Sequence, residues 1–149
     1  IRPAVNVGIS VSRVGGSAQS RAMKQVAGRL RLDMANFREL ASFAQFGSDL
    51  DKITLSQLNR GLRLQEILKQ PQYEPVPLVN QVIVLYATTN GYADQVSVDR
   101  MKEWEAALIR HMTGSESALC ATIEKEKTIS EDSEEKLKKA LEVFSATWA

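Results

Sequence analysis

Apolar residues recur every three or four positions over most of the chain, and this spacing is typical of amphipathic α-helices. The first such segment follows Ser17, a residue type favoured at helix N-termini, and ends near Gly47. A second begins after Ser48 or Asp49 and ends before Pro71, because proline disfavours helical geometry in its predecessor. The apolar positions of the first helix are Met23, Val26, Ala27, Leu30, Met34, Phe37, Leu40, Ala41 and Ala44, and those of the second are Ile53, Leu55, Leu58, Leu62 and Ile67.

Four more helices are predicted beyond this point. The third opens at Pro77 and ends at Asn90 and Gly91; it is apolar on nearly all sides, so we expect it to be buried. A fourth starts at Ser97, a shorter fifth follows, and the last starts at Ser130 with acidic residues in its first turn. The apolar positions of these three helices are Val98, Met101, Trp104, Leu108, Ile109 and Met112, then Leu119 and Ile123, then Leu137, Leu141, Phe144 and Trp148.

One segment near the start has a period of two instead. Apolar and polar residues alternate from Val5 to Ser12, which predicts a β-strand. A strand needs a sheet, and no later segment offers a partner, so we expect the sheet to lie in a preceding part of a longer protein. The chain begins at Ile1 without an initiator methionine, in keeping with that expectation. The predicted fold class is therefore mainly α, a bundle of about six helices preceded by one strand.

Composition and charge narrow the function classes. The chain has 149 residues, of which 44% are hydrophobic and 25% charged, as in one globular domain. Its 19 basic and 18 acidic residues give a net charge of +1, which offers no global attraction for nucleic acid or anionic lipid. The basic residues gather early, because no acid precedes Asp33. That run suits an anionic ligand, but a solvated face is the commoner meaning; its members are Arg2, Arg13, Arg21, Lys24, Arg29 and Arg31.

Self-sufficient catalysis and membrane insertion have little support. The sole histidine, His111, is expected to be a surface or helix-capping residue, and the sole cysteine, Cys120, excludes an intramolecular disulfide. The sequence has no group of Cys, His, Asp or Glu residues at the spacing of metal ligands. It also has no glycine-rich phosphate-binding loop ending in Lys-Ser/Thr, so the chain is not expected to hold a triphosphate by itself. The longest apolar run, 82–87, is far shorter than the ~20 residues of a membrane-spanning helix.

Two local features are candidates for chemistry. Arg13 follows the predicted strand and precedes a Gly-Gly turn, so it could be lent across an interface to stabilise charge on a transferring phosphoryl group. From position alone, a structural ion pair is the commoner role. The segment 70–73, Gln-Pro-Gln-Tyr, offers two amides and a ring that could contact a purine, although such loops more often only pack.

The residues also carry a family resemblance. The stretch IRPAVNVGISVSRVGGSAQ, residues 1–19, closely resembles the segment between the nucleotide-binding and helical domains of alpha subunits of F-type ATP synthases. The resemblance continues through AMKQVAG, FAQFGSDLD, RGLRLQEILKQPQY, NGYADQV and TISEDSEEKLK, and departs from the family mainly in 113–127. It implies that residues 1–19 end the nucleotide-binding domain, where the strand joins a parallel sheet, and that 20–149 form the C-terminal helical domain.

The resemblance assigns roles to individual residues. Arg13 matches the family's arginine finger, which reaches into a catalytic site held mainly by the neighbouring beta subunit. Ser10 and Ser12 belong to the same motif, and Ser10 matches a position regarded as required for activity. The adenine side of alpha's own noncatalytic site is matched by Arg2, Pro3, Gln70 and Gln72.

The resemblance also implies a setting. The complex makes ATP from ADP and phosphate using proton flow, and the isolated piece is expected to be inactive. ATP or ADP would be bound, with Mg²⁺ held by beta and by other parts of alpha, and no metal ligand in this chain. Expected partners are the rest of alpha, beta subunits in an alternating hexamer and the gamma shaft, without nucleic acid or direct membrane insertion.

The sequence leaves open the cellular location of the protein and two alternative interpretations of its identity. We expect the matrix side of the mitochondrial inner membrane, with a bacterial plasma membrane or a plastid thylakoid as alternatives. A catalytic beta-type or vacuolar-type subunit is the nearest rival, and the serine-flanked Arg13 argues against it. A standalone helical interaction module without nucleotide chemistry is the alternative from another class.

Overall fold

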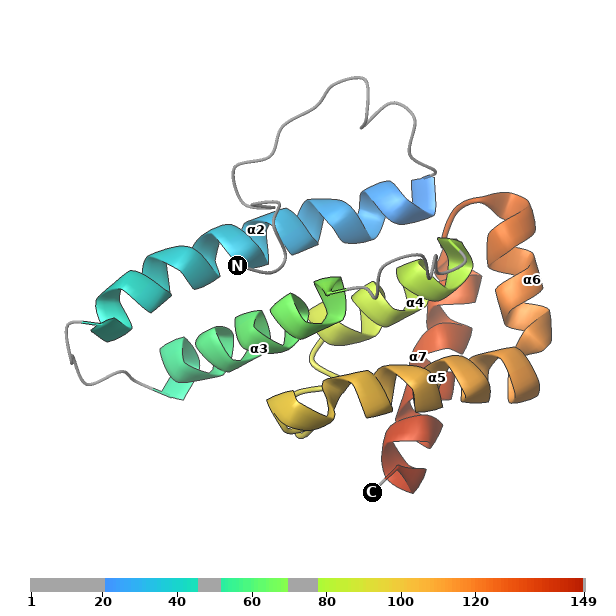
Figure 1. The fold of residues 1–149 in the computed structure, drawn as a ribbon. Coiled ribbons are helices and arrows are strands. Elements are labelled where there is room, and N and C mark those ends of the chain that lie inside the picture. The colour runs from blue at the N-terminus through green and yellow to red at the C-terminus, as the bar shows by residue number, and fades with distance from the viewer. Residues whose placement is uncertain (1–20, 46–51, 70–77, 149) are drawn as a thin grey trace.

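The computed structural model describes residues 21–45, 52–69 and 78–148, and these residues form six α-helices (Figure 1). The prediction of a mainly α bundle with six helices is therefore confirmed. The predicted strand, Ser17 and Pro77 lie outside the described residues. The helices are α2 (Arg21–Gln45), α3 (Lys52–Leu68), α4 (Leu78–Thr89), α5 (Met101–Ser115), α6 (Ser117–Glu126) and α7 (Glu131–Thr147), with a 3-10 turn, η1 (Val98–Arg100), before α5.

The helices form two connected groups. Helices α2 and α3 lie side by side and antiparallel, and α4 packs against both of them (Figure 1). Helices α5 and α6 also contact α4, and α7 packs against both of them and crosses α5 (Figure 1). One continuous hydrophobic core joins the two groups, and its largest fully buried side chains include Leu64, Ile83, Trp104, Leu108, Met112, Leu137 and Leu141.

Helix α4 lies at the centre of this core. It is buried at Asn80 and at every position from Val82 to Thr89, which confirms the prediction from its all-round apolar sequence. The two buried threonine hydroxyls donate to backbone carbonyls one turn back, Thr88 to Val84 at 2.7 Å and Thr89 to Leu85 at 2.8 Å. Both hydroxyls are thus satisfied within the helix itself.

Two predicted helix starts have different outcomes. Ser130 is the N-cap of α7, because its hydroxyl accepts a hydrogen bond from the Ser133 amide at 3.2 Å. Ser97 makes no such side-chain bond, and the residues after it form η1, so α5 begins only at Met101. The predicted fourth helix therefore exists but starts later than expected.

The prediction for α3 needs a correction. Ile53 and Leu55, predicted on its apolar side, are exposed by 71% and 46%, whereas Leu64, absent from the predicted stripe, is completely buried. The rest of the prediction is confirmed, because Ile67 is buried and Leu58 and Leu62 are partly buried against the core. The fully buried positions of α3 are Gly61, Leu64 and Ile67. Packing along this face begins at Leu58, so the two apolar residues before it remain at the surface.

The contact between α2 and α3 depends on a residue without a side chain. A Cβ atom at Gly61 would lie 2.3 Å from Cδ2 of Phe37, too close for any rigid neighbour. We expect Gly61→Ala to destabilise the domain by about 1–3 kcal/mol, because the helices must separate or the ring must move. Urea unfolding followed by circular dichroism measures the change.

Gly28 on α2 supplies the matched control for this prediction. No heavy atom lies within 4 Å of a Cβ placed there, so Gly28→Ala is expected to be neutral or to stabilise by up to about 1 kcal/mol through helix propensity. Equal losses for the two variants would contradict the close-contact argument.

Candidate functional site

The residues predicted to contact nucleotide all precede or interrupt the described helices. Arg2, Pro3, Ser10, Ser12 and Arg13 lie before α2, and Gln70 and Gln72 lie between α3 and α4, outside the described residues. Their roles stay predictions. The structure instead describes how the helices adjoining both segments are held.

The first turn of α2 is bound to the connection between α6 and α7. The Ala22 amide donates to the Lys127 carbonyl at 3.0 Å, which satisfies one of the free amides at a helix start. The Gln25 side chain donates to the Ile129 carbonyl at 3.3 Å and accepts from the Ile129 amide at 3.1 Å. Lys127, in the left-handed conformation with φ 55°, ends α6 and turns the backbone toward this contact. The helix after the Arg13 segment is thus fixed at its start.

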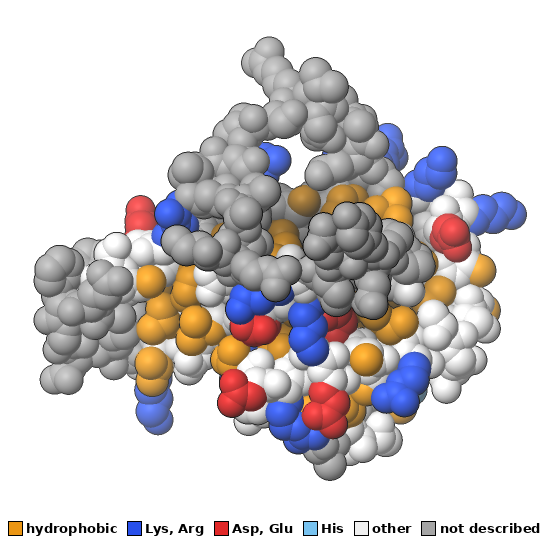
Figure 2. All heavy atoms as spheres, in the orientation of Figure 1, with side chains coloured by type: hydrophobic (Ala, Val, Ile, Leu, Met, Phe, Trp, Pro, Cys, Tyr) orange, Lys and Arg blue, Asp and Glu red, His pale blue; other side chains and the backbone are white. Residues whose placement is uncertain are grey.

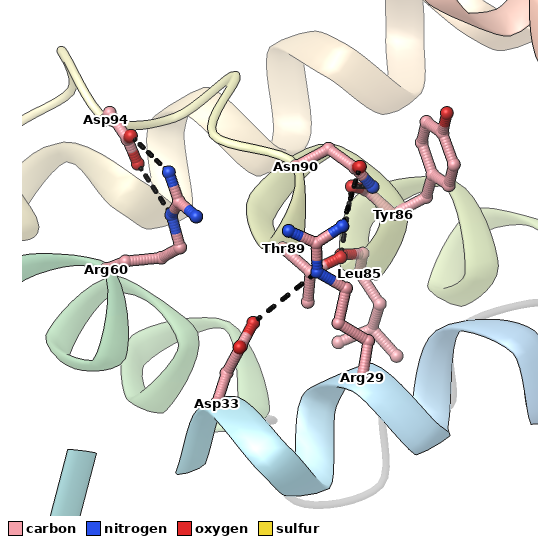
Figure 3. Close-up of polar contacts among 8 residues, drawn as sticks. All are labelled: Arg29, Asp33, Arg60, Leu85, Tyr86, Thr89, Asn90 and Asp94. Atoms are coloured by element: carbon pink, nitrogen blue, oxygen red, sulfur yellow. Dashed lines mark hydrogen bonds and ion pairs between the residues drawn. The ribbon is translucent and has the colours of Figure 1, made fainter. Parts of the chain in front are cut away.

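The second half of α3 is bound to the turn after α4. Arg60 forms a bidentate contact with Asp94: its Nη2 and Nε donate to the Asp94 carboxylate at 2.7 and 3.2 Å (Figure 3). Gly91, with φ 88°, makes room for this pair, since a Cβ there would lie 2.8 Å from the Arg60 guanidinium. This hydrogen bond raises the pKa of Arg60, so the guanidinium keeps its charge.

The end of α3 has further contacts. Arg63 Nε donates to the Val96 carbonyl at 2.6 Å, and Lys102 of α5 donates to the carbonyl of Lys69. Lys69 also forms an ion pair with Glu66 at 2.6 Å. Lys69, which directly precedes the segment 70–73, is therefore held by contacts from two helices, α3 and α5.

A polar cluster joins α2 to the end of α4. Arg29 donates to Asn90 Oδ1 at 3.1 Å, and its Nε lies 4.0 Å from Asp33 Oδ2, an ion pair without a hydrogen bond (Figure 3). That Asp33 oxygen is buried and has no hydrogen-bond partner among the described residues. Burial raises the pKa of Asp33 above its usual range, and the charges of Arg29 and Arg60 offset this only in part.

The raised pKa of Asp33 predicts a pH-dependent stability. The folded state favours the protonated carboxyl, so wild type loses stability as pH rises from the usual aspartate range through the raised value. We expect Asp33→Asn to gain stability at pH 7, by no more than about 1 kcal/mol, because the neutral amide avoids the cost of burying a charge. The gain should shrink toward zero below about pH 4, where the wild-type carboxyl is neutral too.

Thermal unfolding of both proteins between about pH 3.5 and pH 7.5 measures this difference across the range where an aspartate titrates. Asp132→Asn is the control, because Asp132 is exposed and pairs with Lys136 at 3.2 Å on the surface of α7. A gain at Asp33→Asn that grew toward low pH would contradict the direction of the pKa shift.

A small polar hollow adjoins this cluster. It has a volume of about 190 Å³ and lies where α2, α4 and the start of α7 meet. Tyr86 donates to Glu134 there at 3.0 Å, and burial together with this bond raises the pKa of the tyrosine above its usual range. The hollow is also lined by Gln25, Arg29 and Asn90.

The basic run at the start of the chain is described only from Arg21 on. Arg21, Lys24 and Arg29 are exposed and Arg31 is half-buried. This arrangement agrees with a solvated face. Figure 2 shows acidic and basic side chains intermixed on one face of the molecule, without a large patch of one sign among the described residues.

His111 and Cys120 have structural surroundings. The prediction of a surface or capping role for His111 is wrong, because its ring is half-buried and tilts against Phe144 with centroids 5.5 Å apart. Cys120 is buried and donates weakly to the Met112 carbonyl at 3.5 Å; burial raises the pKa of its thiol, which keeps it unreactive. Within 21–45, 52–69 and 78–148, no three His, Cys, Asp or Glu residues are grouped as metal ligands.

Sequence reasoning missed the residues that hold the helices in place. Gln25 was not singled out, and neither were Arg60, Arg63 and Asp94. The contact of Gln25 with Ile129 spans 104 positions and that of Arg63 with Val96 spans 33, so no local spacing reveals them. The Asn90-Gly91 turn was the one local signal for this region.

Comparison with known proteins gives consistent matches. The family model described as ATP synthase alpha/beta chain, C terminal domain, matches residues 19–144. Proteins named ATP synthase subunit alpha from two strains of Dehalococcoides mccartyi, BAV1 and CBDB1, are each 55% identical over 145 residues. These matches span 97% of this sequence and 29% of each relative, so the chain spans less than a third of the length of these relatives. The resemblance seen in the sequence is confirmed.

Proposed function

Because the protein belongs to the family of C-terminal domains of ATP synthase alpha and beta subunits, we propose that it is the C-terminal part of a regulatory, noncatalytic alpha subunit of a proton-translocating ATP synthase. The observation that carries the proposal is the 55% identity to subunits named alpha across 97% of the sequence. In this proposal residues 1–19 complete the nucleotide-binding domain, and 20–149 form the C-terminal helical domain.

In this function Arg13 acts on a catalytic site of the adjacent beta subunit. A guanidinium is always charged and has a planar fork of donors, so it can stabilise the charge that develops on phosphoryl oxygens in the transition state. Ser10 and Ser12 belong to the same motif, and in this proposal Ser10 is required for activity. The docking of the first turn of α2 on Lys127 and Ile129 supports this role, because it gives the segment a fixed end.

A second proposed site is the noncatalytic one, which holds ATP or ADP by the adenine. Arg2 and Pro3 line one side of the base, and the amides of Gln70 and Gln72 complete the pocket. The attachment of Lys69 to Glu66 and Lys102 supports this assignment, since hydrogen-bond readout of a base needs donors and acceptors at fixed positions. Mg²⁺ belongs to beta and to other parts of alpha in this proposal.

The proposed assembly is an alternating hexamer of alpha and beta subunits around the gamma shaft. ATP synthesis is an activity of the whole complex, and this piece alone is not an enzyme. None of the described helices combines the length and apolar character needed to span a bilayer. We propose a peripheral position; the two bacterial relatives favour the plasma membrane of a bacterium over the mitochondrial location expected from the sequence.

Co-purification from the native source tests the proposed function. We expect this sequence within a longer polypeptide that travels with beta and gamma subunits, as intact-mass measurement and peptide mapping would show. Recovery as a free polypeptide of 16.5 kDa, without those subunits, would contradict the proposal and favour the standalone interaction module.

A further inference from the structure

We propose that a hollow beside the end of α7 is a binding site for a small aromatic carboxylate, which stacks on aromatic rings and is held by the guanidinium of Arg100. The hollow has a volume of about 380 Å³, within the range of ~300–1,000 Å³ that small-molecule sites occupy. Its walls come from the turn after α4, from η1 with the start of α5, and from the end of α7. The inference goes beyond the proposed function and uses none of the residues assigned there to nucleotide.

Aromatic rings form much of the wall of this hollow. Trp104 lines it from the core and is 1% exposed. Tyr92 and Trp148 also line it and are half-buried, so part of each ring remains accessible. These three residues include both tryptophans of the chain. Aromatic rings pair favourably with one another in stacked or edge-on geometry, and the wall therefore favours a planar aromatic ligand over an aliphatic one.

The polar groups of the wall favour an anion. Arg100 is the one charged residue among the described residues that line the hollow, and the amide of Gln95 and the hydroxyls of Ser97 and Ser145 lie around it. All four side chains are able to donate hydrogen bonds. The planar fork of a guanidinium matches the two oxygens of a carboxylate, so a carboxylate is the expected anion.

The contacts of Arg100 keep its charge at the hollow and leave it open to exchange. Its guanidinium lies 4.5 Å from the centre of the Trp148 ring, a second residue of the same wall. Its Nε and Nη2 donate to Glu103 at 3.2 and 3.3 Å. Glu103 is exposed, and ion pairs at such positions are weak. An entering carboxylate is therefore able to replace Glu103 on the guanidinium, while the ring of Trp148 keeps the cation in place.

Photolabelling of the intact complex with 4-azidobenzoate tests the site. Light couples the aryl azide to the residues beside it, and mass spectrometry of the peptides locates the label. We expect label on the segments around Trp104 and Trp148, rising to saturation with the concentration of the probe. The neutral analogue 4-azidobenzamide should need about a tenfold higher concentration for half-saturation, the factor that corresponds to one charge-assisted hydrogen bond.

Three variants assign the charge preference to one residue. Arg100→Met keeps an unbranched apolar side chain and should abolish the preference for the carboxylate over the amide. Arg110→Met removes an exposed arginine of α5 and should leave the preference unchanged. Glu103→Gln removes the competing carboxylate and should lower the half-saturating concentration of 4-azidobenzoate about threefold. Such a gain of affinity is not a result that misfolding produces.

The proposal is overturned by label that is absent from these segments or that rises without saturation, and equally by equal affinity for the two probes. A preference for the carboxylate that survives in Arg100→Met would also overturn it. If Arg100→Met does not assemble, Glu103→Gln decides instead: tighter binding supports the exchange on the guanidinium, and unchanged binding contradicts it.

Discussion

Arg13→Lys in the assembled complex is expected to reduce steady-state ATP hydrolysis by about 10³- to 10⁵-fold, the range measured for arginines supplied to phosphoryl transfer. Lysine keeps the positive charge but has a compact ammonium in place of the planar fork, so it lacks the fixed pair of parallel N–H donors that a guanidinium presents to phosphoryl oxygens. The interaction belongs to the transition state, and nucleotide affinity at the catalytic sites should therefore stay nearly unchanged. Turnover and nucleotide binding, measured on the same preparation, provide both numbers.

Arg21→Lys is the matched control for this variant. Arg21 is exposed at the start of α2, in the same basic run, and its replacement should leave turnover unchanged. Unaltered turnover in the Arg13 variant would contradict the trans-acting role and return Arg13 to the interpretation as a structural ion pair.

Trp104→Ala is expected to destabilise the helical domain by about 3–5 kcal/mol. Trp104 is 1% exposed and meets the Phe144 ring edge-on with centroids 6.4 Å apart, so its loss leaves a cavity between α5 and α7. Domains of this size are stable by about 5–15 kcal/mol, and the variant should lie near the edge of folding at physiological temperature. Urea unfolding by circular dichroism checks this.

The other tryptophan provides a control of the same chemistry. Trp148 is half-buried, and the Arg100 guanidinium lies 4.5 Å from the centre of its ring. A contact of this kind at a partly exposed position is worth about 0.5–1 kcal/mol, so Trp148→Ala should cost far less than Trp104→Ala. Equal losses would show that Trp104 does not hold the two helices together.

The helices were predictable because their signals are local. Apolar spacing located all six, and Ser130 showed where α7 begins. The exposed start of α3 was not predictable in the same way, because Ile53 and Leu55 have the spacing of a buried stripe but lie where no described helix covers them. Spacing identifies a face that is able to be buried, whereas its burial depends on what the fold places against it.

The contacts around the candidate site were not predictable from spacing. Resemblance supplied the nucleotide-contacting residues, and those remain predictions. The pairs that hold the adjoining helices, Arg60 with Asp94 and Gln25 with Ile129, join polar residues far apart in the sequence. A surface arginine and a paired arginine look alike in a sequence, because the difference lies in what the fold places opposite them. The same reason explains why the packing of the sole histidine on an aromatic ring was missed.

The bond between Gln25 and Ile129 has a consequence for synthesis on the ribosome. The two residues are 104 positions apart, and translation adds about 5 to 20 residues per second, so the first turn of α2 waits about 5 to 20 s for its partner. During that interval α2 and α3 have already emerged and are able to pair, while the free start of α2 is open to chaperones or to a wrong neighbour. The N-terminal end of this domain is therefore among the last parts to be secured, although it is the first to be made.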